Sequence, residues 1–595
     1  MAPRPDDDLA IQPGQHGIRW CPFRGGVARS GPLSWAQEYM WRAINLPGND
    51  SNMDHLFTVR VHSVISIDTA VACFGRLIER HATLRTAIVA NPDGSVKQRV
   101  LPSGSIPVHV IGVTRGLLNS EIAAQLPLIS GSPPIQALVI VTAGRVTNLA
   151  MRLSHIVSDE WGVRLIKEDL AAELADPLTR PARPEEKTSV DLADYESSES
   201  GRLASDRALD YIADQLARAP QTMFAHRPRA ASRPRYWNVE LQSKALLMAL
   251  ARIRTEQRLM LSAPVIGSFA AIMAVRASLP SALVYVMSNN RTAPWQEFSG
   301  PLLQEAPICM HLSEPGCGGL VRSINVSVFN AYQRGRHDPL ASWRRVEEIE
   351  FERGVFIDKL ARTATVNIHP QPLDRVRERC SLAQLRAMAR ASTFSLTPRA
   401  DIDNLGFFLD VNVGTSCLVL AARVDTRLVS LAESEAILAG MEKIVCELTE
   451  GDVEIGDIPR LCPGIGRDIA DGTRIVDGCR ISIADCADVL RAHPDVAAAQ
   501  VRLDDATITA YIHARTRDLD PGRLHRYVVA ALPRYPLAIA PHVYRIYSSR
   551  PDQMDDVSGW DQGELLAAGT GRDRSATDPE RPGRPVAAGQ QGLQD

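Results

Sequence analysis

The apolar residues of this 595-residue chain switch repeatedly between two spacings, and this switching limits the folds that the chain can adopt. A strand-like run, Leu56 to Val64, is followed by a run at helical spacing, Ile67 to Glu79. A second strand-like run, Thr147 to His155, leads through a short loop into a helical stretch that reaches Leu174. Strands that interleave with helices predict an α/β layered fold.

The same pattern continues through the second half of the chain, where four helices and four strands are expected. They are helix Ser262 to Ala277, strand Leu283 to Met287, strand Phe407 to Val413, helix Ala432 to Cys446, helix Ile483 to Ala492, strands Ala497 to Leu503 and Ala506 to Ile512, and helix Pro521 to Leu532.

Polar, proline-rich segments divide the chain into parts. Such connectors run from Asp176 to Glu186 and from Arg227 to Arg235, and a polar segment, Glu450 to Pro459, ends the second lobe. We therefore predict a disordered arm over 1–29, a first lobe over 30–180, a linker with a helix over 181–240, and a second lobe over 241–459. A small α+β unit over 460–560 and a disordered tail over 561–595 complete the prediction.

Charge and cysteine content exclude several classes of protein. The 66 Lys and Arg residues against 69 Asp and Glu give a net charge of -3, so the whole chain offers no attraction to nucleic acid. The ten cysteines contain no Cys-x-x-Cys pair and no dense cluster, which argues against a zinc site or a disulfide framework. The N-terminal residues lack the apolar core of a secretory signal, and the most apolar stretch, Leu261 to Val275, is too short to span a bilayer. We expect a soluble, cytoplasmic protein that binds neither a metal nor a membrane.

One loop combines side chains suited to acyl transfer. In Ser154 to Gly162, His155 ends a strand, and the carboxylate of Asp159 follows four residues later. A histidine can take a proton from an attacking amine or alcohol near neutral pH. A lone histidine near an aspartate is more often structural, so spacing alone leaves both readings open.

The surrounding sequence resembles the condensation domains of nonribosomal peptide synthetases, from about Ser30 to Pro459. The matching elements occur in the family's order: Ser34 to Trp41, Arg80 to Thr86, Ser154 to Gly162, Asp194-Tyr195, Met287 to Arg291 and Ser299 to Leu302. The resemblance implies an α/β fold of two chloramphenicol-acetyltransferase-like lobes that form a V around a central tunnel.

The resemblance also implies a function and roles for the residues of the loop. Carrier proteins would present substrates on phosphopantetheine, and an amine or aminoacyl acceptor would attack the donor thioester to form an amide. His155 matches the family's essential histidine and would act on the nucleophile. Asp159 matches an aspartate that forms a structural ion pair, for which Arg291 and Arg85 are the candidate partners.

Two residues depart from the family's pattern. Ser154 stands where the family usually has a first histidine, and Glu160 replaces a glycine. Together with Trp161 and Gly162, they are expected to line the tunnel and contact substrate. The departures leave two alternatives open: a catalytically silent scaffold that recruits other enzymes, and an ester-forming O-acyltransferase.

Residues from Ile475 to about Trp560 resemble the small C-terminal subdomain of adenylation domains. The family's catalytic lysine is missing, because Pro551 to Asp555 occupies its place and the last of the six lysines is Lys443. No Gly-x-x-x-x-Gly-Lys-Ser/Thr phosphate loop occurs either. The chain is therefore expected to bind no cofactor and use no ATP. Since no carrier-like attachment site is found, carrier proteins would act in trans.

Overall fold

The computed structural model describes residues 14–45, 54–117, 119–126, 132–175, 187–224, 229–313, 315–358, 362–369, 379–399, 406–466, 472–551 and 557–573. The chain forms two compact units. Unit 1 takes the residues up to Asp206 together with Asn289–Gln304 and Arg336–Pro339, and unit 2 takes the rest.

Unit 1 contains a five-stranded sheet in the order β1-β6-β7-β8-β3 and a three-stranded sheet in the order β2-β5-β4. Its elements are β1 (His16–Arg24), β2 (Arg29–Pro32), α1 (Trp35–Ile44), β3 (Asp54–Arg60), α2 (Ile67–Arg80), the short 3-10 helix η1 (Ala82–Arg85), β4 (Thr86–Ala90), β5 (Val96–Val100), β6 (Ser103–Val113), α3 (Asn119–Gln125), β7 (Ile135–Thr142), β8 (Arg145–Ser154), α4 (Glu160–Ala175) and α5 (Ser189–Ser197). Helix α6 (Glu199–Ala217) begins in unit 1 and continues into unit 2.

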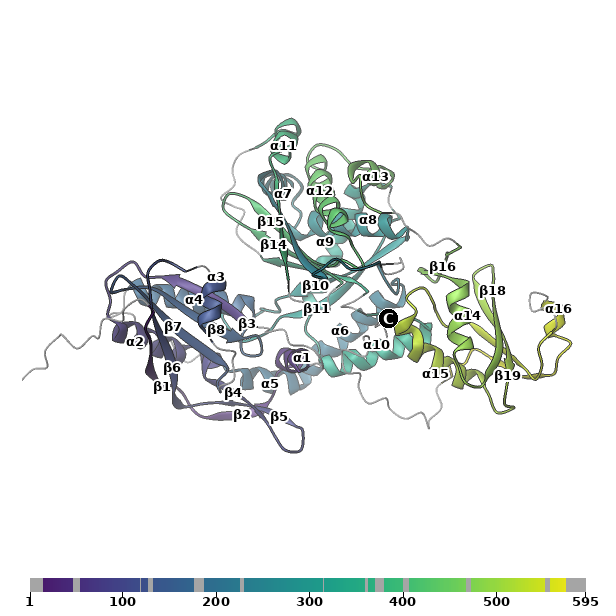
Figure 1. The fold of residues 1–595 in the computed structure, drawn as a ribbon, viewed down its shortest axis with the longest axis horizontal. Coiled ribbons are helices and arrows are strands. Elements are labelled where there is room, and N and C mark those ends of the chain that lie inside the picture. Colours follow the sequence, from purple (N-terminus) through teal and green to yellow (C-terminus); the bar gives the residue numbers. More distant parts are fainter. Residues whose placement is uncertain are drawn as a thin grey trace, which may run out of the picture. The chain divides into compact units, whose positions relative to one another are not determined.

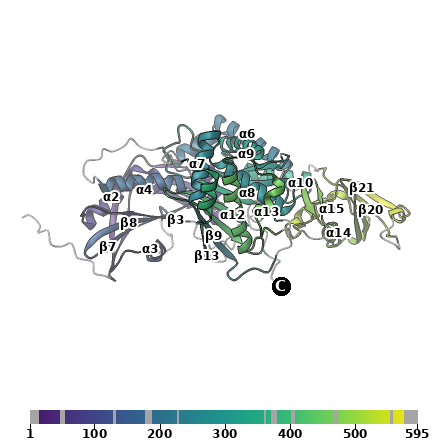
Figure 2. The same cartoon turned by 90° about the horizontal axis from the view of Figure 1, so that it is seen from above.

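The five-stranded sheet of unit 1 buries both of its faces. Successive side chains on a strand point to opposite faces. On β7, Ala137 and Val139 accordingly join the core beneath α2 and α4, whereas Leu138 and Ile140 join a smaller core that includes Ile122 of α3. Helices α2 and α4 lie side by side (Figures 1 and 2) and pack against each other and the sheet. The packing buries β8 between its neighbours β7 and β3.

Unit 2 is built around a seven-stranded sheet in the order β11-β10-β12-β14-β15-β9-β13. Its elements before residue 470 are β9 (Tyr236–Ser243), α7 (Lys244–Gln257), α8 (Ser262–Ala277), β10 (Ser281–Ser288), β11 (Gln304–His311), α9 (Cys317–Gln333), α10 (Pro339–Arg353), β12 (Ala364–His369), α11 (Leu382–Ala389), β13 (Thr393–Pro398), β14 (Phe407–Val413), β15 (Leu418–Asp425), α12 (Leu431–Glu447), η3 (Ile455–Asp457) and α13 (Ile458–Leu461). Helices α7, α8, α9 and α12 pack on the sheet and on one another (Figure 1).

The C-terminal part of unit 2 adds a hairpin and a four-stranded sheet in the order β18-β19-β20-β21. Its elements are β16 (Arg474–Val476), β17 (Cys479–Ile481), α14 (Ile483–Arg491), β18 (Val496–Asp504), β19 (Thr507–Ala514), α15 (Pro521–Ala531), η4 (Leu532–Arg534), β20 (Val543–Tyr547), α16 (Val557–Trp560) and β21 (Leu565–Gly569).

Long polar side chains fasten this C-terminal part to the rest of unit 2. Gln221 donates to the carbonyl oxygens of Pro536 and Ala538, at 3.0 and 3.1 Å. Arg480 donates from Nε to the carbonyl oxygen of Ala277, at the end of α8, over 3.1 Å. One continuous hydrophobic core runs through both regions. Residues 460–560, which we predicted as a unit of their own, therefore fold onto the second lobe.

Two predictions of disorder are wrong for the described residues. Within the predicted arm over 1–29, residues 16–24 form β1, which pairs antiparallel with β6 and buries Cys21 and Phe23. Within the predicted tail over 561–595, β21 pairs with β20, and Arg572 donates to the carbonyl oxygen of His542 at 3.2 Å. Both β1 and β21 are edge strands, so each depends on pairing with a strand elsewhere in the sequence, and the polar composition around them hides that pairing. Residues 1–13 and 574–595 lie outside the described residues.

The elements predicted from apolar spacing are confirmed with small shifts of their ends. The predicted helix Ser262 to Ala277 and strand Phe407 to Val413 coincide with α8 and β14. The connector predicted from Asp176 to Glu186 lies outside the described residues. The two units also cut the chain differently from the predicted lobes, since residues 289–304 and 336–339 belong to unit 1.

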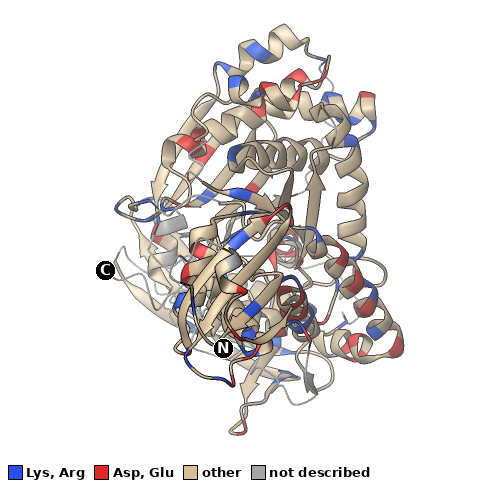
Figure 3. Ribbon diagram, turned by 90° about the vertical axis from the view of Figure 1, so that its right-hand side faces the viewer, with Lys and Arg blue, Asp and Glu red and all other residues tan. Residues whose placement is uncertain are grey.

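Two further properties bear on the predictions made from composition. Acidic and basic residues are interspersed along the ribbon (Figure 3), in line with the small net charge of -3. Within the described ranges, no single helix is long and apolar enough to cross a membrane. Helices α7 and α8 reach that length and apolarity only as a pair, with a bend of 115° between them.

Candidate active site

The loop that follows β8 is held between two strands and a helix. Strand β8 pairs with β7 on one side and with β3 on the other, and its last residue, Ser154, lies opposite Asp54. The chain then turns sharply, and the backbone N–H of Val157 donates to the carbonyl oxygen of Ser154 at 3.0 Å. The hydroxyl of Thr83 donates to the carbonyl oxygen of Val157 and so supports the turn. His155 therefore lies in a hydrogen-bonded turn between β8 and α4, which is called the corner below.

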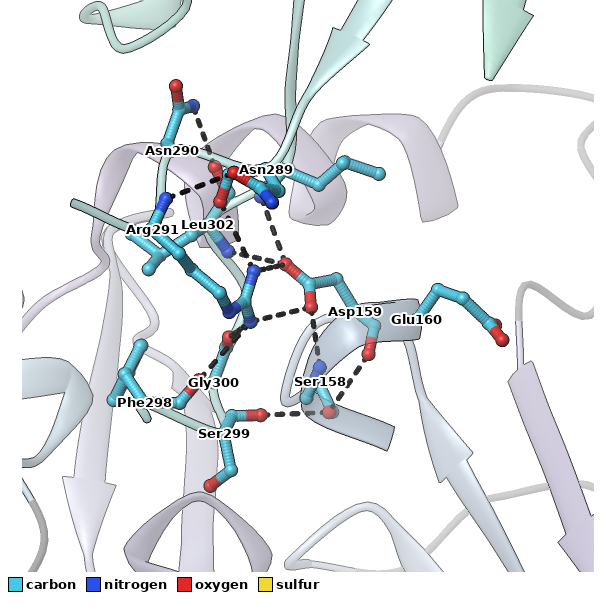
Figure 4. Close-up of polar contacts among 12 residues, drawn as sticks. Ser158, Asp159, Glu160, Asn289, Asn290, Arg291, Phe298, Ser299, Gly300 and Leu302 are labelled. Carbon is cyan, nitrogen blue, oxygen red and sulfur yellow. Dashed lines mark hydrogen bonds and ion pairs between the residues drawn. The ribbon is translucent and has the colours of Figure 1, made fainter. Parts of the chain in front are cut away.

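Asp159 and Arg291 form a buried ion pair at the end of this loop (Figure 4). The guanidinium donates from Nη1 to Oδ2 at 2.9 Å and from Nη2 to Oδ1 at 2.7 Å. The same Nη2 also donates to the carbonyl oxygens of Phe298 and Gly300, at 3.2 and 2.9 Å. The two side chains are 1% and 2% exposed. A bidentate pair of this kind fixes both the distance and the relative orientation of its partners.

Backbone N–H groups complete the hydrogen bonding of Asp159. Its Oδ1 accepts from the N–H of Gly162 at 2.9 Å, as an N-cap carboxylate does at the start of a helix. Its Oδ2 accepts from the N–H groups of Leu302 and Leu303, at 2.9 and 3.1 Å. Burial alone would raise the pKa of Asp159, but Arg291 and these N–H groups outweigh it and hold the pKa below its usual range. The carboxylate is thus a charged structural clamp that joins Arg291 to the start of α4 and to the backbone of Leu302 and Leu303.

Close packing explains why position 162 is a glycine. A Cβ added there would lie 2.0 Å from the carbonyl oxygen of Ser299 and 2.6 Å from the hydroxyl of Ser158. That hydroxyl donates to the same carbonyl oxygen at 2.9 Å (Figure 4). The sequence motif that ends in Gly162 and the one that begins at Ser299, far apart in the chain, therefore meet inside unit 1.

His155 is half-buried and faces a second histidine. The centroids of its ring and that of His55, on β3, are 4.4 Å apart, with the ring planes tilted by 47°. Burial and, secondarily, the neighbouring His55 lower the pKa of His155 to about 4. Its Nδ1 atom is buried and has no hydrogen-bond partner among the described residues. At neutral pH the side chain is therefore an uncharged imidazole with proton-accepting capacity.

The structure brings most of the predicted site residues together. Ser154 and Glu160 flank the corner that carries His155, and Glu160 turns away from the Asp159 clamp (Figure 4). Trp161, in the first turn of α4, packs its ring beneath the guanidinium of Arg164, at 3.9 Å from the ring centroid.

The prediction of Arg85 as an alternative partner for Asp159 is wrong. Arg85 is 1% exposed, and its Nη1 donates to the carbonyl oxygen of Leu101 at 3.0 Å. Leu101 directly follows β5 of the three-stranded sheet, whereas the ion-pair partner of Asp159 is Arg291.

Two residues of the predicted motif Arg80 to Thr86 form contacts that stabilise the fold. Arg80 donates from Nη2 to Glu173 of α4 at 2.8 Å, and His81 contacts Asp169 of the same helix at 3.1 Å. These contacts tie the end of α2 to α4. The motif therefore supports α4, the helix that follows Asp159.

His55 is the residue that sequence reasoning missed. It starts a strand whose apolar run was predicted only from Leu56, and nothing local indicates that this strand pairs with β8. Its Nδ1 lies 3.4 Å from Oε2 of Glu160. The described residues hold no group of three or more His, Cys, Asp and Glu side chains that could bind a metal ion.

In sequence, the chain is similar to parts of nonribosomal peptide synthetases. No protein-family model matches the chain. The probable non-canonical nonribosomal peptide synthetase CymA of Salinispora arenicola is 28% identical over 247 residues, which cover 37% of this chain and 3% of CymA. The nonribosomal peptide synthetase agiA of Aspergillus flavus is 26% identical over 216 residues, covering 34% of this chain and 3% of agiA. The chain thus matches only a small part of these long relatives.

Solved structures of condensation domains share the fold. The starter condensation domain of rhizomide synthetase aligns with 72% of this chain and 96% of its own, at 16% identity and a TM-score of 0.54. The condensation domain that mediates chain release from the enacyloxin polyketide synthase aligns with 74% of this chain and 85% of its own, at 18% identity and a TM-score of 0.53.

Proposed function

We propose that this chain, which has the mixed α/β fold of nonribosomal peptide synthetase condensation domains, forms an amide bond between a carrier-bound acyl or aminoacyl thioester and an amine. The observation that carries the proposal is the convergence of separate motifs on one corner. The His155 loop, Arg291 and the segment from Phe298 to Leu303 meet through the Asp159 clamp. Homology to nonribosomal peptide synthetases adds support from an independent direction.

The reaction needs a base that is neutral before the amine attacks. The amine nitrogen adds to the thioester carbonyl carbon, the carbon–sulfur bond then breaks, and the amide and a carrier thiol are released. His155, with a pKa lowered to about 4, is available to take the proton that the nitrogen loses and to return it to the departing sulfur. The Asp159 clamp keeps the corner in place, and proton transfer does not pass through it.

The partners in this proposal are carrier proteins acting in trans, each with its substrate on phosphopantetheine. The protein itself binds no cofactor and uses no ATP, and it works in the cytoplasm. Ser154, Glu160, Trp161 and Gly162 line the approach of the substrate. The V-shaped placement of the two lobes and the tunnel between them stay predictions.

The role of the C-terminal part follows from its lysine-free sequence. We infer that residues 460–560 are an adenylation-like remnant without activity of its own. The segment Pro551 to Asp555, where the catalytic lysine would stand, is lysine-free, and its residues 552–555 lie outside the described residues. The remnant then stabilises the fold, because its Pro536 carbonyl accepts from Gln221 and its Arg480 donates to the carbonyl of Ala277.

Transfer from a loaded carrier protein tests the proposal directly. Candidate carriers are charged with an acyl or aminoacyl thioester, mixed with the protein and an amine, and followed by intact mass. Loss of the acyl mass from the carrier, with formation of the amide, supports the proposal. Formation of an ester from an alcohol acceptor would instead favour the O-acyltransferase, and no transfer with any carrier would favour the silent scaffold.

A further inference from the structure

The corner that carries His155 contains two more ionisable side chains from different elements. His55 comes from the start of β3 and Glu160 from the first residue of α4. The His55 ring contacts the His155 ring at a centroid distance of 4.4 Å, and His55 Nδ1 lies 3.4 Å from Glu160 Oε2. The three side chains thus form a row, from the carboxylate through one imidazole to the other.

The row of Glu160, His55 and His155 differs from the neighbouring Asp159–Arg291 pair in how its charges are balanced. Asp159 is matched by Arg291 and bound by three backbone N–H groups, so its charge is already balanced. The charged groups that act on His155 are His55 from β3, Asp159 from the loop and Glu160 from α4. His55 lowers the pKa of His155, whereas the carboxylates of Asp159 and, more weakly, Glu160 raise it.

Exposure divides the row into a buried and an open end. The side chain of His55 is 16% exposed, whereas that of Glu160 is 57% exposed. His55 Nε2 and His155 Nδ1 are both buried and have no hydrogen-bond partner among the described residues. The contact with Glu160 suits the form of His55 that carries a proton on Nδ1 and so fixes the ring orientation. A ring held in this way limits the positions that the His155 imidazole can take.

We propose that His55 is a positioning residue for His155, held by Glu160, so that the second imidazole of the site comes from the neighbouring strand. This inference rests on the proposed function, because positioning matters for the acyl transfer assigned to His155. His55 touches no reacting atom. It acts by packing against the His155 imidazole and by lowering the pKa of that imidazole.

Histidine titration by NMR tests the inference without any activity. Selective 13C labelling of the imidazoles follows the 14 histidines, and His155→Ala identifies the signal of interest. His55→Phe keeps a ring but removes the imidazole that lowers the pKa of His155, so that pKa should rise by roughly one unit. Glu160→Gln should shift it the opposite way, because the carboxylate favours the protonated form of His155. His55→Asn serves as the second variant if His55→Phe does not fold.

Matched controls come from exposed residues of the same elements. His62 is exposed shortly after β3, and Glu168 of α4 has a side chain that is 64% exposed. His62→Phe and Glu168→Gln should leave the titration of His155 unchanged. If His55→Phe and His55→Asn also leave the His155 pKa within about 0.2 units of its original value, the inference is overturned.

The transfer reaction supplies a second readout. In His55→Phe, kcat/KM at neutral pH should fall about tenfold, and the acidic limb of its pH profile should move up with the pKa of His155. An unchanged profile despite a shifted pKa would also overturn the positioning role. If the unaltered protein transfers no acyl group, the proposed function fails, and the NMR titration still decides whether His55 sets the state of His155.

Discussion

Replacing Asp159 by asparagine should destabilise the active-site corner by about 3 kcal/mol. The side chains of Asp159 and Arg291 are 1% and 2% exposed, and they share hydrogen bonds of 2.7 and 2.9 Å. Removing one partner of a buried pair costs about 3–5 kcal/mol, because the other charge stays buried. Asparagine keeps an acceptor oxygen for the start of α4, so the loss lies toward the lower end of that range.

Hydrogen exchange followed by mass spectrometry measures this loss where it occurs. Peptides that cover residues 154–163 and 298–303 should exchange faster, with their opening free energy reduced by about 3 kcal/mol. Asp214→Asn is the control, since Asp214 pairs with Arg218 on an exposed face, where both side chains are more than half exposed. That change should cost less than about 0.5 kcal/mol. An Asp159→Asn protein that exchanges like the control would refute the clamp.

Three further outcomes follow from the packing and the buried charges. Gly162→Ala places a Cβ 2.0 Å from the carbonyl oxygen of Ser299 and should lower the unfolding free energy by about 2–3 kcal/mol, as followed by urea titration, whereas Gly116→Ala, in open space, should not. Burial lowers the pKa of His525 to about 4, so the neutral form contributes its full stability above about pH 6.5. This contribution declines by about 3 kcal/mol as the pH falls toward 4. His525→Gln should flatten that dependence of the unfolding free energy on pH, and an unchanged slope would contradict the prediction. Arg480→Met removes two donors to the carbonyl groups of Ala277 and Ser278 at the end of α8 and should cost about 2 kcal/mol, so that limited proteolysis releases the C-terminal part faster. Equal cleavage rates would show that these bonds do not hold it.

The spacing of apolar residues predicted the helices and strands better than it predicted which strands pair. Helix α8 and strand β14 follow from residues a few positions apart, because apolar periodicity is a property of the local sequence. The strand β1 was missed because its stability comes from pairing with β6, about 85 residues later, and from burying only Cys21 and Phe23. Pairing across such a separation leaves no periodic signal in the strand itself.

The residues of the candidate site were likewise predicted in part, and their contacts were not. Family resemblance located His155, Asp159 and Arg291, and the structure joins the last two in one ion pair. The resemblance could not separate Arg291 from Arg85, since both lie in recognisable motifs and only the structure shows that Asp159 pairs with Arg291 while Arg85 donates to Leu101. His55 was invisible because its contact with His155 depends on the register of β3 against β8, which no single segment encodes.

The transfer rate of His155→Ala, measured by intact mass with a loaded carrier and an amine, tests the central claim most directly. Proton transfer by a positioned side chain contributes about 10²–10⁴-fold to a rate, and Asp159 and Arg291 keep the loop in place when the imidazole is absent. We predict a loss of at least about a hundredfold in a protein whose hydrogen exchange matches that of the original. Amide formation at the original rate in that folded protein would contradict the claim.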